Sequence, residues 1–206
     1  MLTRQSIIDA GLALVRSEGL GAIGLRSVAV RLGVTPMALY RYVADSTDLR
    51  DAVIARILAG VPTAPGDGDW PDRYERWAVA ARAVLATCPG VVRHVLLHWF
   101  ESPRMLDVVE SLLAVADDAG LTGFEAVASA NAVLMFVLMR VEAEHAVREG
   151  GAMVRELSPV DDAASRLPLL AANRDNCTIA RIDEHFNYGL RVVLNGIAAR
   201  GRSVRC

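Results

Sequence analysis

The chain has 206 residues, of which 53% are hydrophobic and 5% aromatic, and its formal net charge is −2. This length can bury a sizeable core, and the weakly acidic balance excludes a uniformly polybasic nucleic-acid binder. Three widely spaced cysteines, Cys88, Cys177 and Cys206, predict neither a disulfide framework nor a zinc site and fit a reducing cytoplasm. The N-terminus lacks a signal-peptide core, and the longest uncharged run, Ala126–Met139, is too short to cross a bilayer.

Charge is distributed unevenly along the chain, and every basic residue is an arginine. Residues 1–42 contain five arginines and two acidic residues, for a net charge of +3. Residues 61–206 contain 15 arginines and 19 acidic residues, for a net charge of −4. A basic N-terminal segment on an acidic body suits local contact with phosphates. The apolar residues are mostly alanine, leucine and valine, which favours packed helices over a β-sandwich.

The first two predicted helices are identified by apolar residues at helical spacing. The first runs from Thr3 to Ser17, and its stripe is Ile8, Leu12 and Val15, widened by Ile7, Gly11 and Leu14. Thr3 is a suitable N-cap for it, and Gly19 is a suitable C-terminal stop. The second helix, Leu25–Leu32, directs Leu25, Val28, Ala29 and Leu32 to one face.

The third and fourth predicted helices are marked by their N-termini. Thr35 is a good N-cap, and Pro36 stands at the first helical position, where its missing N–H costs nothing. We expect this third helix to end near Tyr42. After a short turn, Asp45 can cap a fourth helix, whose buried stripe is Leu49, Val53 and Ile57.

Residues 59–69 (AGVPTAPGDGD) are rich in Gly, Pro and Asp and predict a boundary. We expect a head at residues 1–58, a connector at 59–69 and a helical body at 70–206. Helical patterns in the body occur in WPDRYERWAVAARAVLATCPG, VVRHVLLHWF, SPRMLDVVESLLAVADDAG, Phe124–Arg148 and, after a segment broken by Gly and Pro at 150–178, Ile179–Ala199. Because no strand pattern occurs, the sequence predicts an all-α fold.

The segment LRSVAVRLGVTPMALYRYV has the form of a helix-turn-helix, in which a glycine-containing turn joins two short helices. The angle between the helices would be fixed by packing of Val28, Ala29, Leu32, Val34 and Leu39. The second helix would then present its N-terminal turn and exposed face to a DNA major groove. By pattern alone, an ordinary two-helix corner is the alternative interpretation.

Residues 1–58 closely resemble the N-terminal domain of the TetR family of transcriptional regulators. The matching segments are LTRQSIIDAGLALVRSEG, LRSVAVRLGV, TPMALYRYV and DLRDAVIARI, in the family's order and spacing. Beyond the head the resemblance is looser and rests on the helix pattern and on FNYGLRVVLNGI near the end. The resemblance implies a helix-turn-helix DNA-binding head followed by a helical body for ligand binding and dimerisation.

The resemblance also implies roles for individual residues of the head. Arg26, at the start of the second helix, matches a position that can contact a guanine or a phosphate, and Ser27 lies beside it on the same exposed face. The groove-facing positions of the recognition helix are matched by Thr35, Pro36, Met37, Ala38 and Arg41. Phosphate- and base-contacting positions are matched by Tyr40 and Tyr42, and a phosphate-contacting position at the fourth helix by Ser46.

Two positions depart from the family's pattern. Where Ser46 stands, the family usually has a lysine, so we expect slightly weaker and less salt-sensitive DNA binding. Gly24 replaces the usual Ser or Thr cap of the second helix, at a cost of roughly a few tenths of a kcal/mol.

The ligand cavity implied for the body would draw on polar and aromatic groups placed in apolar runs, which are His94, His98, Trp99, Asn131, Phe136, Met139 and Arg140. Arg140 follows an apolar run and needs a partner, for which an anionic ligand would serve, although Glu144 at i+4 is the simpler choice. The His94 and His98 pair, even with His145, is weak evidence for a metal. Nothing near Cys88 in the sequence indicates a redox sensor.

In TetR-like proteins the last two long helices form a dimer bundle. The final predicted helix carries apolar residues at helical spacing, which are Ile179, Ile182, Phe186, Leu190, Val193 and Ile197. Gly189 and Gly196, seven residues apart, could allow a partner helix to approach closely. Burial of this face within the same subunit is the alternative.

The predicted function is that of a cytoplasmic, homodimeric repressor that binds a palindromic operator in double-stranded DNA and is released by a small-molecule effector. The competing class is a helical enzyme, or a binding protein that does not bind DNA. No nucleophile–base pair, HExxH motif, phosphate loop or paired-carboxylate signature occurs in the sequence to support catalysis. We therefore expect no catalytic residue, cofactor or metal, and no membrane association.

Overall fold

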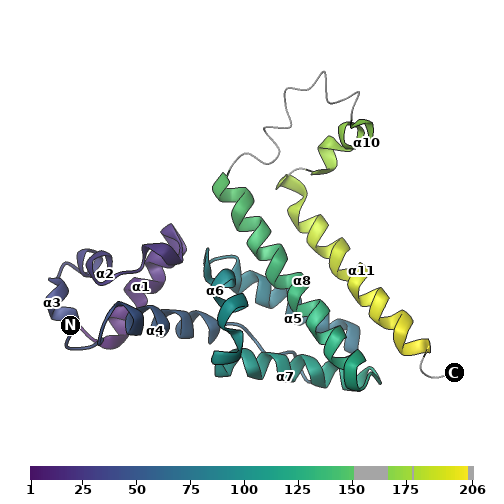
Figure 1. Cartoon of the computed structure of the whole chain (residues 1–206), viewed down its shortest axis with the longest axis horizontal. Coiled ribbons are helices and arrows are strands. Elements are labelled where there is room, and N and C mark those ends of the chain that lie inside the picture. Colours follow the sequence, from purple (N-terminus) through teal and green to yellow (C-terminus); the bar gives the residue numbers. More distant parts are fainter. Residues whose placement is uncertain (151–166, 178, 204–206) are drawn as a thin grey trace. The chain divides into compact units, whose positions relative to one another are not determined.

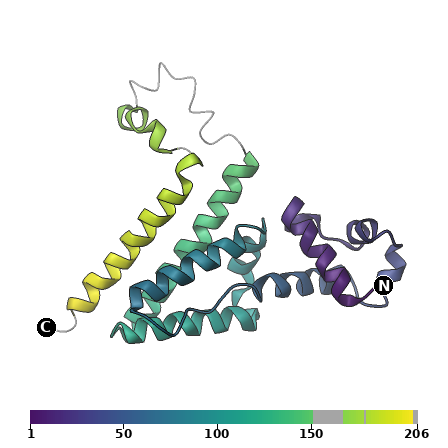
Figure 2. The ribbon, with the colours of Figure 1, turned by 180° about the vertical axis from the view of Figure 1, so that it is seen from behind.

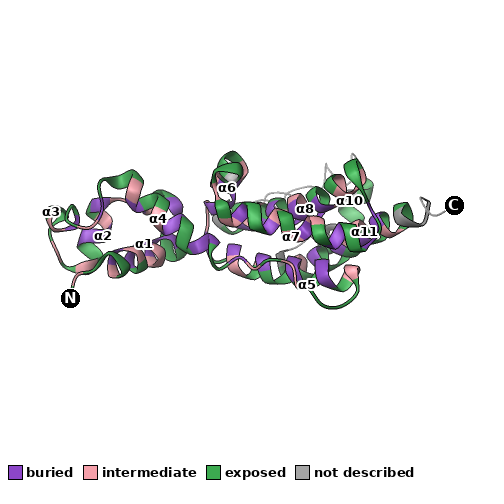
Figure 3. Cartoon of the chain, turned by 90° about the horizontal axis from the view of Figure 1, so that it is seen from below, coloured by how far each residue is buried: buried purple, intermediate pink, exposed green. Residues whose placement is uncertain are grey.

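The computed structural model describes residues 1–150, 167–177 and 179–203, and every regular element in these ranges is a helix (Figure 1). The predicted all-α fold is therefore confirmed. Residues 1–142 form one compact unit, and residues 143–206 form a second. Figure 3 shows that the helices of the first unit carry buried residues along one side and exposed residues along the other.

Helix α1 spans Arg4–Glu18 and begins with the predicted cap. The Oγ1 atom of Thr3 accepts a hydrogen bond from the backbone N–H of Ser6 at 3.0 Å. The Oγ atom of Ser6 accepts one from the N–H of Thr3 at 2.9 Å. The helix ends at Gly19, whose φ of 85° favours glycine. A short 3₁₀ turn, η1 (Leu20–Ala22), then leads to α2 (Leu25–Leu32).

Four of the six residues predicted for the buried stripe of α1 are buried, namely Ile7, Gly11, Leu14 and Val15. Ile8 and Leu12 are half-buried, whereas Ile7 and Leu14 lie in the core. At Gly11, an added Cβ would stand only 2.6 Å from Cγ2 of Val53. Because Gly11 has no side chain, α4 (Ser46–Leu58) packs closely against this face of α1.

The turn between α2 and α3 depends on a glycine, as the helix-turn-helix pattern predicts. Gly33 ends α2 with a left-handed φ of 66°. Helix α3 spans only Pro36–Leu39 and is shorter than expected. The backbone N–H groups of Tyr42 and Val43 both donate to the carbonyl of Leu39, at 2.8 and 3.1 Å. This tight turn brings Val43, which is 2% exposed, into the core of the head.

The connector at residues 59–69 is fastened to the body by side-chain hydrogen bonds. The Nε1 atom of Trp77 donates to the carbonyl of Pro62 at 3.0 Å. The Nε and Nη2 atoms of Arg104 donate to the carbonyl of Val61 at 3.0 and 2.7 Å. These bonds hold the segment that follows α4 on helices α5 and α7, inside the first compact unit. The division into head, connector and body stays a prediction.

The body begins with α5 (Trp70–Leu85), α6 (Val91–His98), the 3₁₀ turn η2 (Trp99–Glu101) and α7 (Pro103–Asp118). Helix α5 ends four residues before Pro89, the predicted stop, because the N–H groups of Thr87 and Cys88 turn back to the carbonyls of Val84 and Leu85. Helices α5 and α7 pack together (Figure 2). The hydroxyl of Tyr74 on α5 donates to the carbonyl of Leu112 on α7 at 3.0 Å.

Helix α8 (Gly123–Gly150) and helix α11 (Ile182–Ser203) are the two longest described elements. Between them lie α10 (Pro168–Ala172) and the 3₁₀ turns η3 (Arg174–Cys177) and η4 (Ile179–Arg181). By length and composition alone, residues 123–148 could cross a membrane, with a mean hydropathy of 1.6. An apolar core helix passes the same test, so this feature is weak evidence for a membrane span.

The apolar stripe predicted for the last helix is buried in part in the single chain. Phe186, Leu190 and Ile197 are 0%, 1% and 7% exposed in the single chain, while Ile182 and Val193 are half-buried. The side chain of Ile179 lies outside the described residues. Burial within one subunit, the alternative interpretation, therefore accounts for Phe186, Leu190 and Ile197.

Candidate nucleic-acid interface

The exposed face of α3 and of the turn that follows it gathers the residues expected to read DNA. Leu39 and Val43 are buried beneath this face, at 0% and 2% exposure. Above them, the exposed positions are Thr35, Pro36, Met37, Tyr40 and Arg41, with Ala38 and Tyr42 half-buried. Among the predicted groove-facing residues, only Ala38 is partly covered, so the structure brings this set together on one surface.

The chemistry of this surface suits the edges of base pairs. Met37 is 74% exposed and could contact a thymine methyl group. Arg41 is exposed and offers the planar donor fork that pairs with guanine O6 and N7. The Thr35 side chain makes no capping hydrogen bond, which leaves its hydroxyl available to another partner.

The start of α2 has one exposed candidate and one with a structural role. Arg26 is exposed, as a contact to a guanine or a phosphate requires. Ser27 is half-buried, and its hydroxyl bonds to the carbonyls of Ala22 and Gly24 at 2.7 and 3.0 Å. These bonds brace the start of α2, where Gly24 provides no side-chain cap. A DNA contact by Ser27 stays a prediction.

The start of α4 contains the predicted residue Ser46 and also Asp48, whose pairing with Arg4 the sequence interpretation missed. Ser46 is exposed at the first position of α4, behind the predicted N-cap Asp45, which accepts hydrogen bonds from two backbone N–H groups. Asp48, one turn into α4, forms an ion pair with Arg4 at 2.7 Å. No sequence pattern links an exposed arginine at the start of one helix to an aspartate 44 residues away.

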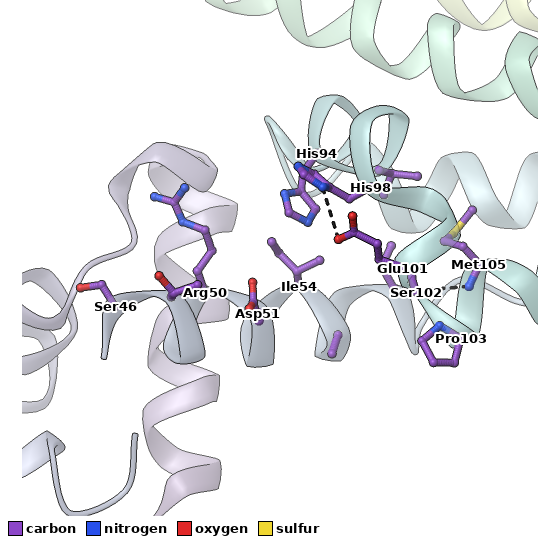
Figure 4. A pocket seen from close by; sticks show the side chains of 14 residues that line it. Ser46, Arg50, Asp51, Ile54, His94, His98, Glu101, Ser102, Pro103 and Met105 are labelled. Atoms are coloured by element: carbon purple, nitrogen blue, oxygen red, sulfur yellow. Dashed lines mark hydrogen bonds and ion pairs between the residues drawn. The ribbon is translucent and has the colours of Figure 1, made fainter. Parts of the chain in front are cut away.

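A groove of about 760 Å³ lies where α4 meets α6 and the start of α7 (Figure 4). Helix α4 contributes Ser46, Thr47, Arg50, Asp51, Ile54, Ala55 and Leu58 to its wall. The opposite wall contains His94 and His98, two of the predicted ligand-binding residues. Their ring centroids are 4.6 Å apart, and Nδ1 of His98 lies 3.4 Å from a carboxylate oxygen of Glu101. Burial and the neighbouring His98 lower the pKa of His94.

The predicted ligand-binding residues of α8 do not line this groove. Asn131 and Met139 are exposed on α8, and Phe136 and Arg140 are half-buried there. Trp99 belongs to η2, but its side chain lies outside the described residues. The structure therefore brings His94 and His98 together and leaves the α8 residues apart from them.

The expected ion pair between Arg140 and Glu144 is wrong. Glu144 is 1% exposed, and its Oε2 atom lies 3.8 Å from Nη2 of Arg148. A glutamate that precedes an arginine by four residues has the favoured orientation on a helix, which explains the choice of Arg148. The Nε atom of Arg140 is buried and has no hydrogen-bond partner within the described ranges.

Across the described residues, no three His, Cys, Asp or Glu side chains are arranged to hold a metal ion. Cys88 is a free cysteine with 1% of its surface exposed, and among the described residues only Thr87 lies within hydrogen-bond distance of its sulfur. A buried thiol of this kind has little access to an oxidant.

Comparison with known proteins agrees with the helical architecture. Residues 61–200 match the family model of the tetracyclin repressor-like C-terminal domain. The chain is 27% identical to the HTH-type transcriptional repressor DrrR1 of Streptomyces coeruleorubidus, covering 95% of this chain and 77% of that protein. It is 29% identical to the class A tetracycline repressor protein from transposon 1721 of Escherichia coli, covering 99% and 94%.

A solved structure, described as a possible TetR family transcriptional regulator from Streptomyces coelicolor A3(2), superimposes with a TM-score of 0.78. Its sequence is 30% identical, and the superposition covers 95% of this chain and 98% of that one. The head thus carries a helix-turn-helix, and the rest matches the family's C-terminal domain over most of its length. The chain belongs to the TetR family of transcriptional regulators.

Proposed function

We propose that this chain is a homodimeric repressor that binds a palindromic operator in double-stranded DNA and is released by a small-molecule effector. The observation that carries the proposal is the exposed face of α3, where Thr35, Met37 and Arg41 surround a buried Leu39 in the head of a TetR-family chain. Two relatives that align over nearly the whole chain are named as repressors, which favours repression over activation.

In this proposal the N-terminal turn of α3 enters the major groove. Arg41 donates to a guanine and Met37 contacts a thymine methyl group, while Arg26 and Ser46 lie toward the flanking phosphates. A two-fold dimer would place two such helices on half-sites about 34–36 Å apart, centre to centre. The palindromic operator follows from the symmetry of the dimer.

The dimer surface is proposed on the exposed stripes of α8 and α11. On α8, the apolar residues Phe124, Val127 and Met139 are 85%, 56% and 52% exposed. On α11, Tyr188 and Val192 are 69% and 54% exposed at i and i+4. Exposed apolar side chains that line up along a helix indicate a surface for a partner. A second copy is the partner that the family membership supports.

Close approach of helices is possible further along the same side of α11. A Cβ added at Gly196 would meet no atom within 4 Å, so a partner side chain has room there. The alanine at position 199 is exposed too. This side of the helix replaces the predicted face of Phe186, Leu190 and Ile197, because those residues are buried without a partner chain.

The effector is proposed to act through α4, which has Ser46 at its DNA-facing end and lines the groove along most of its length. The groove has a volume typical of small-molecule sites, which span roughly 300–1,000 Å³. His94, His98 and Arg50 give it polar groups that could orient a ligand. An effector that binds better when α4 and α6 are further apart would favour dimers whose heads no longer fit the operator.

Two contacts would transmit such a movement. Arg104 donates to the carbonyl of Val61, just beyond the C-terminal end of α4. This contact would fix that end of α4 while the rest of the helix rotates about it. The N–H of Leu20 in the head donates to the carbonyl of Pro89, just before α6, at 2.9 Å. A shift at the start of α6 would therefore reach the head directly as well as through α4.

The polar end of an effector has a second candidate on α8. The buried Nε of Arg140 lacks a hydrogen-bond partner in the described part of the chain, now that Glu144 pairs with Arg148. An anionic or carbonyl group on the effector would supply an acceptor for it.

Selection of duplexes from a random DNA library by the purified full-length chain tests the proposal. We expect a palindromic consensus whose half-sites are one helical turn apart, and the absence of any consensus would contradict DNA recognition. Release is then measured by fluorescence anisotropy with a panel of small molecules that includes tetracyclines, because one relative is named for them. His98→Ala should change the effector concentration needed for release and leave the affinity of the effector-free protein unchanged.

A further inference from the structure

Arg4 and Asp48 join three elements of the head at the edge of the DNA-reading surface. The Nη2 atom of Arg4 donates to Oδ1 of Asp48 at 2.7 Å, and Nη1 donates to Oδ2 at 3.2 Å. The Nη1 atom also donates to the backbone carbonyl of Tyr42 at 2.5 Å. Asp48 in turn accepts from the backbone N–H of Ala44 at 2.8 Å. The start of α1, the end of the recognition turn and the start of α4 are thus tied together.

We propose that this Arg4–Asp48 clasp positions the recognition helix for sequence-specific DNA binding, although neither residue reads a base. The proposal rests on the proposed function in one respect, namely that α3 docks in the DNA major groove. It assigns a specificity-determining role to two residues outside the positions for which the family resemblance implies DNA contact.

Helix α3 needs support of this kind because it has only four residues. So short a helix is not stable by itself and takes its orientation from tertiary contacts. On its inner side, the buried Leu39 and Val43 supply those contacts. At its C-terminal end, the segment 40–42 is exposed or half-buried and has no apolar anchor. The bond from Arg4 to the Tyr42 carbonyl fixes this end, next to Arg41.

Stability alone does not account for the clasp. The Arg4 and Asp48 side chains are 47% and 32% exposed, and ion pairs at such positions contribute little to folding. A bidentate arginine–carboxylate pair instead fixes geometry, because its two parallel hydrogen bonds set both the distance and the angle between the two side chains. The pair also holds the pKa of Asp48 down at about 2, so the clasp stays formed throughout the physiological pH range.

Removing the charge of Asp48 tests the proposal, because the clasp and a purely electrostatic effect predict opposite changes in the affinity for the operator. Removing a negative charge near the phosphates, with no other effect, strengthens binding to any duplex. Asp48→Asn keeps the shape of the side chain and an acceptor for the Ala44 N–H, but it loses the charged pair with Arg4. The clasp therefore predicts weaker binding to the selected operator, by about ten-fold, the scale of one lost base contact. Binding to random DNA should be unchanged or tighter.

Arg4 is tested through the salt dependence of binding. If Arg4 itself bound a phosphate, Arg4→Ala would lower the slope of log affinity against log salt by about 0.9 at each half-site. The clasp predicts a loss of operator affinity with the slope unchanged. Arg4→Lys keeps the charge but cannot form the bidentate pair, so it should lose specificity as Arg4→Ala does.

The measurements compare a duplex selected by the wild-type chain with a random duplex of equal length. Asp9→Asn is the matched control, since Asp9 is an exposed acidic residue of α1 that bonds only to Gln5 among the described hydrogen bonds. Helicity and thermal unfolding are recorded for every variant. Tighter binding of Asp48→Asn to both duplexes, or a fall in the salt slope for Arg4→Ala, would overturn the clasp. A wild-type chain that selects no sequence would instead overturn the proposed function, before any variant is examined.

Discussion

Exposed apolar side chains occur both on the recognition surface of the head and on the two long helices, but their neighbours differ. In the head, Val30 and Met37 are 81% and 74% exposed and are interspersed with Arg26, Arg31 and Arg41. Phe124 and Val127 lie three positions apart on α8 with no arginine between them, and Tyr188 and Val192 lie four positions apart on α11.

This difference indicates different partners. An apolar group beside a cation suits DNA, which presents thymine methyl groups within reach of charged phosphates. A continuous apolar stripe suits another apolar surface, because a charged partner would lose hydration there without compensation. Exposure alone therefore does not distinguish the two surfaces, whereas the residues that alternate with the apolar ones do.

The largest effect should come from a charge placed in the stripe of α11. Val192→Arg would put an unpaired guanidinium into the proposed dimer interface twice, once from each subunit. Breaking an interface in this way should cost several kcal/mol, about 3–5 for an uncompensated buried charge. Sedimentation should show monomers at micromolar concentration with helicity retained.

Two comparison variants sharpen this test. Asn187→Arg changes an exposed residue on another side of α11 and should leave the dimer intact. Leu190→Arg places the charge in the core of the single chain, so loss of folding, rather than clean dissociation, is the expected result. A Val192→Arg variant that remains dimeric would move the interface away from this stripe.

Arg41→Ala should weaken operator binding without affecting the fold, since Arg41 is exposed above a core made by Leu39 and Val43. The loss of a bidentate base contact should cost roughly 1–3 kcal/mol at each half-site. Discrimination at the contacted base pair should relax, as measured by affinities for single-base operator variants. Unchanged affinity with normal helicity would remove Arg41 from the set of reading residues.

Gly11→Ala tests the close packing of α1 against α4 in the head. The new Cβ would stand 2.6 Å from Cγ2 of Val53, and such overpacking costs roughly 1–3 kcal/mol. Alanine also stabilises the helix by about 1 kcal/mol relative to glycine, so the expected net loss in the free energy of unfolding is small. Val53→Ala in the same chain should remove the clash, and a thermal unfolding cycle of the four proteins would measure the coupling. Additive effects would contradict the close approach of α1 and α4.

Within the head, the sequence predicted features set by neighbouring residues better than features set by residues far along the chain. The Thr3 cap, the Gly33 turn and the Asp45 cap depend on residues within a few positions of one another, and all three are confirmed. The close packing at Gly11 of α1 depends on Val53, far along the chain, and the short α3 depends on burial of Val43. Neither can be read from local periodicity.

The candidate sites show the same limit. Surface residues of the recognition helix follow from its register, and the structure places them together as expected. The Arg4–Asp48 pair and the meeting of α4 with His94 and His98 require knowledge of which helices are neighbours. Local charge patterning also misled the assignment of Glu144, for which two arginines compete at i−4 and i+4.

The smallest expected effect concerns Ser46, where this chain lacks the lysine usual in the family. Ser46 is exposed at the first position of α4, on the side of the head that the proposal places against a phosphate. Each neutralised phosphate contributes about 0.9 to the slope of log affinity against log salt, so Ser46→Lys should steepen the slope of a dimer by up to about 2. Asp48 is already paired with Arg4, which leaves Asp45 as the acidic neighbour that could reduce this gain.

Affinity for operator and for random DNA should rise together in the Ser46→Lys variant, because a phosphate contact positions the protein without reading the sequence. Ser46→Gln is the matched control, since it adds length without charge and should leave the slope as it is. A salt titration of the three proteins on both duplexes makes the comparison. An unchanged slope for Ser46→Lys would place the start of α4 away from the DNA backbone and contradict the proposed docking of the head.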